Sequence, residues 1–146
     1  MKSKYFFAYI VIAIIILSIA YYLISPAFRT IEADEESRTI SANSEIIAQG
    51  DLKESAHEVE GKALIINDNG KTKLRFEDFE TINGPDLHIY LSSDLDAEDY
   101  IDLGKIKATK GNVNYDIPSE IDISKYNKVL VWCVPFRVLF SYAELK

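Results

Sequence analysis

The chain has 146 residues, and its 23 acidic residues outnumber its 16 basic ones to give a formal net charge of −7. This excess argues against a nucleic-acid partner, because neutralising phosphates requires clustered lysine and arginine. The single cysteine, Cys133, excludes an intrachain disulfide. Its thiol is therefore expected to be either a buried apolar group or a group kept for its chemistry.

An uncharged apolar segment, Tyr5–Ile24, comes first in the chain. As a helix it would be about 30 Å long, which matches the hydrocarbon thickness of a bilayer. Lys2 and Lys4 precede it and acidic residues follow, so the positive-inside rule places residues 1–4 in the cytoplasm and the rest of the chain outside. We expect an uncleaved signal-anchor that holds the protein in the lipid bilayer of the cell membrane as a single-pass protein. A cleaved signal peptide is the alternative, since Ser25-Pro26-Ala27 carries residues that a peptidase accepts.

The next segment, residues 25–49, is polar and acidic and lacks sustained periodicity. It is predicted to be a tether, with a short helical turn at Ser44–Ala48 as a local feature. From Gly50 onward, short apolar segments alternate with turn residues, which is typical of a sandwich or barrel. Residues 50–146 are therefore predicted to form one all-β domain, an antiparallel two-layer β-sandwich or barrel-like fold.

The first two strands of this domain are predicted to form a hairpin. Glu58–Ile66 has the pattern of a strand, with a bulge at Gly61. Asn67-Asp68-Asn69-Gly70 is a hairpin signal, because Asn and Gly tolerate the positive φ of tight turns. Thr72–Phe76 then alternates apolar with basic residues, which predicts a half-buried strand with Arg75 on its wet face.

The remaining elements follow the same logic. A turn at Asn83–Asp86 leads into a strand whose core face carries Leu87, Ile89 and Leu91, with His88 on the other face. An acidic loop follows at Asp94–Asp99; it lacks the glycine and glutamate of an EF-hand, so a solvated loop is expected there. The other expected elements are strands at Ile101–Lys107 and Val113–Ile117 around a turn at Lys110–Asn112, a connector at Pro118–Tyr126 with a helical turn, a strand at Lys128–Val134, and a strand at Phe136–Tyr142 that pairs with it.

Several short motifs occur in a fixed order along the predicted β domain. They are Gly50 with Leu52, His57 with Gly61, Leu74-Arg75-Phe76-Glu77-Asp78-Phe79, Asn83-Gly84-Pro85-Asp86-Leu87-His88-Ile89-Tyr90-Leu91, Leu103-Gly104-Lys105-Ile106-Lys107, Gly111, Tyr115-Asp116-Ile117-Pro118, Val131-Trp132-Cys133, and Phe136 to Leu145. In this order they resemble the DM-thirteen domain, which is found beside DOMON domains in Skeletor-type proteins and alone in many microbial ones. The resemblance covers about Gly50 to Lys146 and suggests a membrane-anchored microbial form. One departure is Leu52, where the family more often has Phe.

The resemblance implies an electron-transfer module centred on Cys133, working with a redox partner protein in the membrane. From the residues alone, Cys133 either packs as a small hydrophobe or acts as a thiolate that binds a metal or haem or is itself oxidised. His57 and His88 are the only histidines. The simpler explanation is that His88 is an exposed or rim residue and that His57 hydrogen-bonds in a turn. Two histidines and one cysteine are nevertheless the equatorial ligands of a blue-copper site, so His57, His88 and Cys133 are candidate metal ligands. Copper and haem are the candidate cofactors, although the absence of Cys-x-x-Cys-His excludes covalent haem attachment.

No nucleophile elbow, zinc-protease helix or phosphate loop is present in the sequence, so no catalytic residue is assigned and a hydrolase or transferase is not supported. Two functions remain open. One is a redox or metal-binding module that uses Cys133. The other is a redox-silent interaction domain in which Cys133 belongs only to the core.

Overall fold

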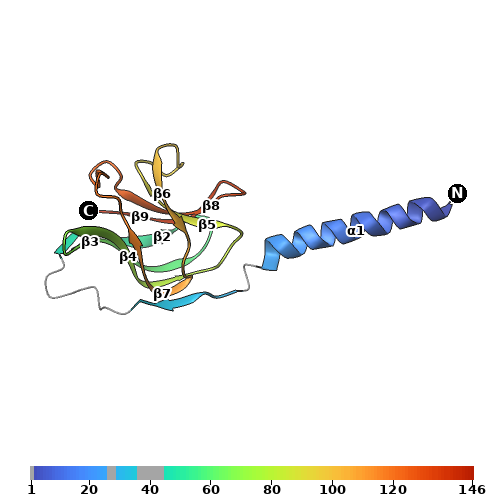
Figure 1. Ribbon diagram of the computed structural model, residues 1–146, viewed down its shortest axis with the longest axis horizontal. Coiled ribbons are helices and arrows are strands. Elements are labelled where there is room, and N and C mark those ends of the chain that lie inside the picture. Colours follow the sequence, from blue (N-terminus) through green and yellow to red (C-terminus); the bar gives the residue numbers. More distant parts are fainter. Residues whose placement is uncertain (1, 26–28, 36–44) are drawn as a thin grey trace.

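A computed structural model describes residues 2–25, 29–35 and 45–146 of the chain (Figure 1). One helix is followed by nine strands in these residues. They are α1 (Lys2–Ile24), β1 (Glu32–Asp34), β2 (Glu45–Glu54), β3 (Val59–Asp68), β4 (Lys71–Thr81), β5 (Leu87–Ser92), β6 (Tyr100–Lys105), β7 (Lys110–Asp116), β8 (Lys128–Cys133) and β9 (Val138–Glu144).

Helix α1 is apolar around its whole circumference. Most of its aliphatic and aromatic side chains from Tyr5 to Ile24 are exposed, and they leave no polar face for water. A helix that is apolar on every side belongs in a protein core or in a membrane, and this one is not covered by the β domain. By length and composition α1 could therefore span a membrane as an anchor or serve as a signal sequence.

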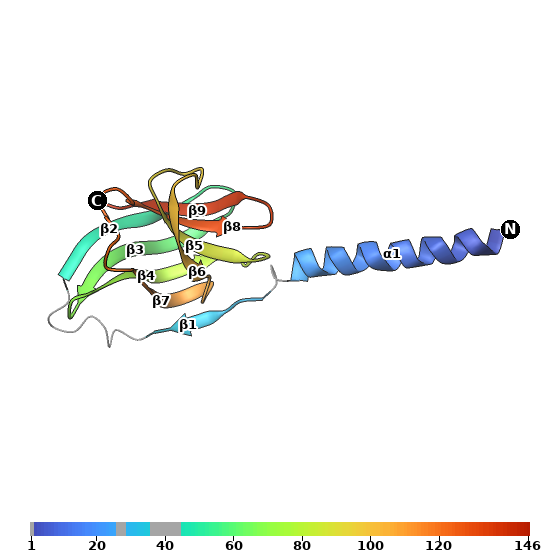
Figure 2. The same cartoon turned by 45° about the horizontal axis from the view of Figure 1, so that its top comes forward.

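The nine strands form one sheet in the order β1-β7-β4-β3-β2-β9-β8-β5-β6, which curls into a half-barrel (Figure 2). All neighbours are antiparallel except β1 and β7. Strand β2 belongs to both halves of the curl, because Glu45–Asp51 pairs with β3 whereas Leu52–Glu54 pairs with β9. The all-β prediction is confirmed in its barrel-like form, with the two layers being halves of one sheet.

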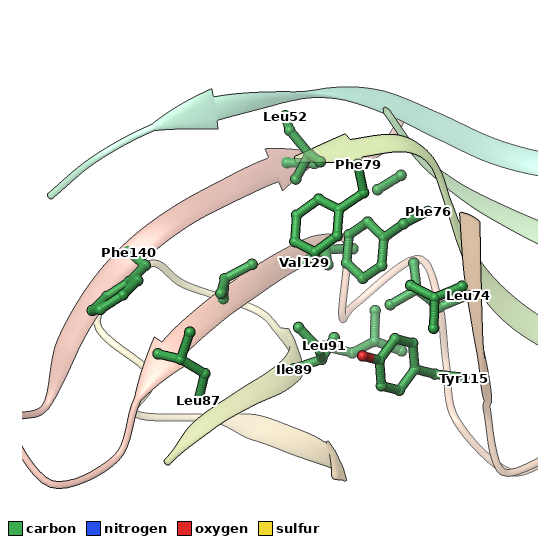
Figure 3. Close-up of a cluster of buried hydrophobic side chains, with 14 of the residues drawn as sticks. Leu52, Leu74, Phe76, Phe79, Leu87, Ile89, Leu91, Tyr115, Val129 and Phe140 are labelled. Carbon is green, nitrogen blue, oxygen red and sulfur yellow. The ribbon is translucent and has the colours of Figure 1, made fainter. Parts of the chain in front are cut away.

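The core lies inside the curl and draws alternate residues from both halves (Figure 3). Phe76 and Phe79 stack with ring centroids 4.7 Å apart. Leu87, Ile89 and Leu91 all face this core, as their spacing predicted. The predicted hairpin between β3 and β4 is present. The predicted bulge in β3 is present as a register shift between Glu60 and Lys62.

Two parts of the predicted tether are strands. β1 lies beside β7 in parallel, and β2 begins at Glu45, so the predicted helical turn is wrong for residues 45–48. Residues 26–28 and 36–44 of the tether lie outside the described part of the chain. Pairing with β3 decides the conformation of residues 45–48, since contacts from distant strands override a weak local preference.

The side chain of Arg75 is buried and not on a wet face as predicted. It is 1% exposed, and its Nε donates to Glu77 Oε1 at 2.9 Å. Its Nη1 donates to Asn114 Oδ1 at 3.2 Å and to the carbonyl oxygen of Glu35 at 3.4 Å. The residue after β1 thus helps to cover the guanidinium, and these charge-assisted bonds offset its desolvation.

The predicted turn at Lys110–Asn112 is wrong, because these residues belong to β7. β7 pairs with β4 and β1, whereas β6 pairs with β5 at the other edge of the sheet. Gly111 has φ = 102°, and a Cβ there would collide with the carbonyl oxygen of Ala33 in β1. Glycine is needed at this position so that β1 can approach, and sequence reasoning read it as a turn signal.

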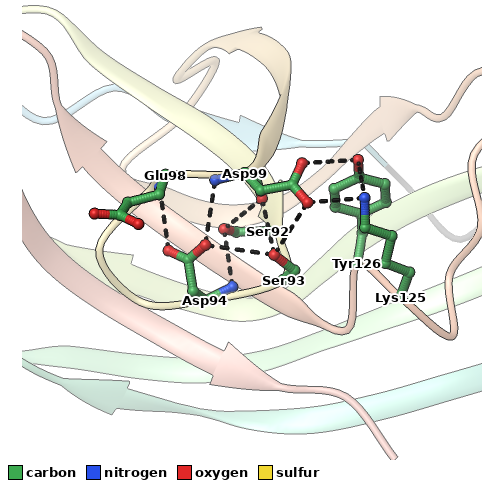
Figure 4. A network of polar contacts seen from close by, with 7 residues as sticks. All are labelled: Ser92, Ser93, Asp94, Glu98, Asp99, Lys125 and Tyr126. Carbon is green, nitrogen blue, oxygen red and sulfur yellow. Dashed lines mark hydrogen bonds and ion pairs between the residues drawn. The ribbon is translucent and has the colours of Figure 1, made fainter.

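The acidic loop between β5 and β6 is ordered by Asp94 (Figure 4). The Asp94 carboxylate accepts the N–H groups of Asp96 at 2.9 Å and Glu98 at 3.1 Å. Its second oxygen accepts the N–H of Asp99 at 3.2 Å, and the Asp99 carboxylate pairs with the Lys125 ammonium at 2.8 Å. These backbone hydrogen bonds lower the pKa of Asp94 below its ordinary value of 3.8.

We expect Asp94→Ala to lower the free energy of unfolding by about 1 kcal/mol at neutral pH, because three N–H groups lose their acceptor. A lowered pKa means that the carboxylate stabilises the fold fully above pH 3.8 and loses this effect as the pH falls through the folded-state value. The difference in unfolding free energy between wild type and Asp94→Ala should therefore shrink in acid. Urea unfolding of the full chain in detergent micelles measures it. Asp96→Ala is the matched control, and an equal loss there would contradict the assignment.

Candidate functional site

An apolar cavity of about 260 Å³ lies at one end of the half-barrel. Its walls come from the connection after β2, the β4–β5 connection, and the end of β8 with the start of β9. Figure 2 shows the β4–β5 and β8–β9 connections at the end of the domain from which α1 extends. The lining residues are His57, Ile82, Asn83, Gly84, Pro85, Cys133, Phe136, Val138 and Phe140.

Cys133 is the last residue of β8 and has no exposed surface. In the sheet it lies between Leu87 of β5 and Val138 of β9, and its Sγ donates to the carbonyl oxygen of Pro85 at 3.3 Å. Burial raises the pKa of the thiol above its ordinary value of 9.0, and the negative charge of Asp86 acts in the same direction. The thiol is thus protonated at neutral pH and held in one place.

The Gly-Pro-Asp-Leu motif forms the turn that closes over this thiol. A Cβ at Gly84 would lie 2.8 Å from Cζ of Phe140, so only glycine fits against that ring. Pro85 supplies the acceptor for the thiol, and the carbonyl oxygen of Asp86 accepts the N–H of Val134 at 3.2 Å. The motif therefore fixes both the sulfur and the chain that leaves β8.

His57 lies in the same cavity. Its ring centroid is 4.0 Å from that of Phe140, and its backbone N–H donates to the Phe140 carbonyl oxygen at 3.1 Å. The side chain is half-buried. His57 and Cys133 therefore line the same cavity.

His88 lies on the other face of the sheet. In the register of β5 and β8, Leu87 is opposite Cys133 and His88 is opposite Trp132. Neighbouring residues of a strand point to opposite faces, so the His88 ring is directed away from the cavity. Its Nδ1 lies 2.8 Å from Oδ2 of Asp102, and its Nε2 lies 3.6 Å from an oxygen of Asp86.

The structure thus brings two of the three predicted metal ligands together and leaves the third apart. Among residues 2–25, 29–35 and 45–146, no group of three or more His, Cys, Asp or Glu side chains is placed to hold a metal ion. A site built on His57, His88 and Cys133 together would need His88 to cross the sheet.

Sequence reasoning missed an aromatic cluster on the outer face, beside His88. The rings of Tyr90 and Tyr100 stack with centroids 4.1 Å apart, and Tyr90 also packs on Trp132 at 6.3 Å. Burial raises the pKa of Tyr90 to about 12. Trp132 is buried, at 9% exposure. An available signal was the unbroken apolar run of residues 129–134, which is typical of a strand covered on both faces.

Comparison with known protein families identifies one match, to the family described as Electron transfer DM13, over residues 51–145. The chain belongs to this family. The predicted resemblance to DM-thirteen is therefore confirmed, and the DM13 match contains every residue that lines the cavity. Comparisons with curated proteins and with solved structures found no match.

We predict that alkylation of Cys133 in the folded DM13 domain accelerates with pH beyond 9.0, because burial raises the thiol pKa and only the thiolate reacts. Iodoacetamide labelling of the full chain in micelles, followed by mass spectrometry from neutral pH to about 10, measures the profile. The same chain unfolded in urea is the control, and its profile should level off earlier. Coincident profiles would show that burial does not perturb the thiol.

Proposed function

We propose that this DM13 protein is an electron-transfer protein held on the extracytoplasmic side of the cell membrane by α1, with Cys133 as its redox centre. The observation that carries the proposal is the contact between Cys133 Sγ and the Pro85 carbonyl oxygen at 3.3 Å. It joins the Gly-Pro-Asp-Leu turn and the Val-Trp-Cys segment at one sulfur. A redox protein of the same membrane would be the partner.

The position of the thiol supports this role. Cys133 is paired on both sides, by β5 and by β9, so its sulfur is held with little freedom to move. Sulfur is the atom in this cavity that can be oxidised and reduced reversibly. His57 is the titratable side chain that lines the cavity with it.

The described residues do not fit a metal held by three side chains, so the proposal assigns the redox change to the sulfur itself. A cavity of about 260 Å³ admits a small oxidant such as a peroxide. The peroxide would convert the thiol to a sulfenic acid, with one oxygen leaving as water or an alcohol. An external thiol would displace water to form a mixed disulfide, and a second external thiol would release Cys133 and leave as the external disulfide.

A redox-silent interaction domain is the second candidate, and one observation favours it. Cys133 has no exposed surface, its pKa is raised, and its hydrogen bond to Pro85 satisfies the thiol. These are the properties of a cysteine that packs as a small hydrophobe. The two candidates differ in whether the thiol reacts while the domain is folded.

We expect hydrogen peroxide to convert Cys133 to a sulfenic acid in the folded full chain, because Cys133 lines a cavity large enough for a peroxide. Trapping with dimedone and mass spectrometry of the protein in lipid nanodiscs measures it, and metal and haem content is determined on the same sample. Cys133→Ala should abolish trapping. Val131→Ala, at a buried position on the same strand and face, should retain it. A wild-type thiol that resists oxidation while folded, in protein without metal or haem, would establish the redox-silent candidate.

The membrane topology is tested separately. We expect a tag after Lys146 to be cleaved by protease added outside intact cells, and the chain to pellet with membranes at its full mass of 16.6 kDa. The reason is the uncharged span Tyr5–Ile24 with two lysines before it. Replacing Lys2 and Lys4 by glutamate should reduce this orientation. A soluble product that begins near Phe28 would instead identify α1 as a cleaved signal sequence.

A further inference from the structure

Two exposed apolar side chains line the Cys133 cavity, and a third lies in the turn beside it. Ile82 is 44% exposed, Val134 is 36% exposed and Phe136 is 54% exposed. Ile82 and Phe136 also line the cavity, and Val134 and Phe136 lie in the turn between β8 and β9. These three residues are called the apolar rim below. Exposed apolar surface is a feature of contacts with a membrane or a protein partner.

The chain that leaves α1 is fixed to this same end of the domain. The side-chain amide of Asn83, which lines the cavity, donates to the carbonyl oxygen of Arg29 at 3.1 Å. Ile31 exchanges two further hydrogen bonds with Thr109, one of 2.9 Å and one of 2.8 Å. The attachment of residues 29–31 therefore does not depend on a single contact.

This attachment limits the distance between the cavity and the end of α1. Arg29 follows Ile24, the last residue of α1, by five positions. Five residues span at most about 18 Å even when fully extended, so Asn83 cannot lie much farther than that from the end of the helix. The β3–β4 hairpin, in contrast, lies at the opposite end of the domain (Figure 2).

We propose that the apolar rim docks on the lipid bilayer that holds α1, so that the Cys133 cavity opens toward the membrane. The occupant of the rim is lipid, because the short attachment keeps the rim at the membrane surface. Arg29 and Arg137 are exposed beside it, where long cationic side chains can reach lipid phosphates. This inference rests on the proposed anchoring by α1, and it is independent of the redox role of Cys133.

Quenching by brominated lipid tests the docking. The full chain carrying Phe136→Trp or Ile82→Trp is reconstituted in vesicles of phosphatidylcholine and phosphatidylglycerol, with or without bromine on the acyl chains. The emission of wild type, which comes from Trp132, is subtracted. We expect roughly half or more of the added emission to be quenched, since side chains that dock at an interface reach the boundary of the acyl chains. Lys71→Trp, in the β3–β4 hairpin, is the control and should not be quenched.

The possible outcomes separate this inference from the anchoring. Alkaline carbonate extraction first shows whether the chain is inserted, and a chain that is extracted contradicts the anchoring itself. For an inserted chain, quenching at positions 82 and 136 above that at position 71 supports docking. An inserted chain with no more quenching at the rim than at position 71 overturns it, whether water or a second protein covers the rim.

Discussion

The divided pairing of β2 determines the shape of the whole domain. Glu45–Asp51 pairs with β3 and Leu52–Glu54 with β9, so the sheet must curl around one core. The same strand leads directly to His57, whose N–H donates to the carbonyl oxygen of Phe140 on β9. The curl therefore encloses the core and also brings the connection after β2 to the end of β8, where Cys133 lies.

Alternation of apolar residues was sufficient to predict most strands and the face on which each core residue lies. Leu87, Ile89 and Leu91 face the core as expected. The failures concern contacts between segments far apart in sequence. Arg75 is covered by the residue after β1, and Gly111 makes room for β1, yet nothing near either position indicates that β1 is there. Local patterns report the preference of one strand, whereas burial on its outer face depends on what packs over it.

In the candidate site, too, local patterns predicted some features, whereas contacts between distant segments decided the rest. The motifs around Gly84 and Cys133 supported the family resemblance, which is confirmed, but the contact between them through the Pro85 carbonyl oxygen was not predicted. The inclusion of His88 as a ligand rested on its being one of only two histidines, although the period of two already placed it on the face opposite Leu87. Strand phase is therefore better evidence for a shared site than residue type. His57 lies in a connection between strands, where no alternation indicates the direction of its side chain. Only the fold could show that it lines the same cavity as Cys133.

A buried thiol poses a physical conflict for a redox centre. Burial protects the sulfur from water but raises its pKa, which lowers the fraction of thiolate that can react. Phe136, in the turn between β8 and β9, and the ring of Phe140 line the same cavity as the sulfur. That turn is also the part of the domain that carries Val134 and Phe136 of the apolar rim. A surface that binds the apolar rim would contact the residues that cover the sulfur, so docking and access to Cys133 are properties of one structural element.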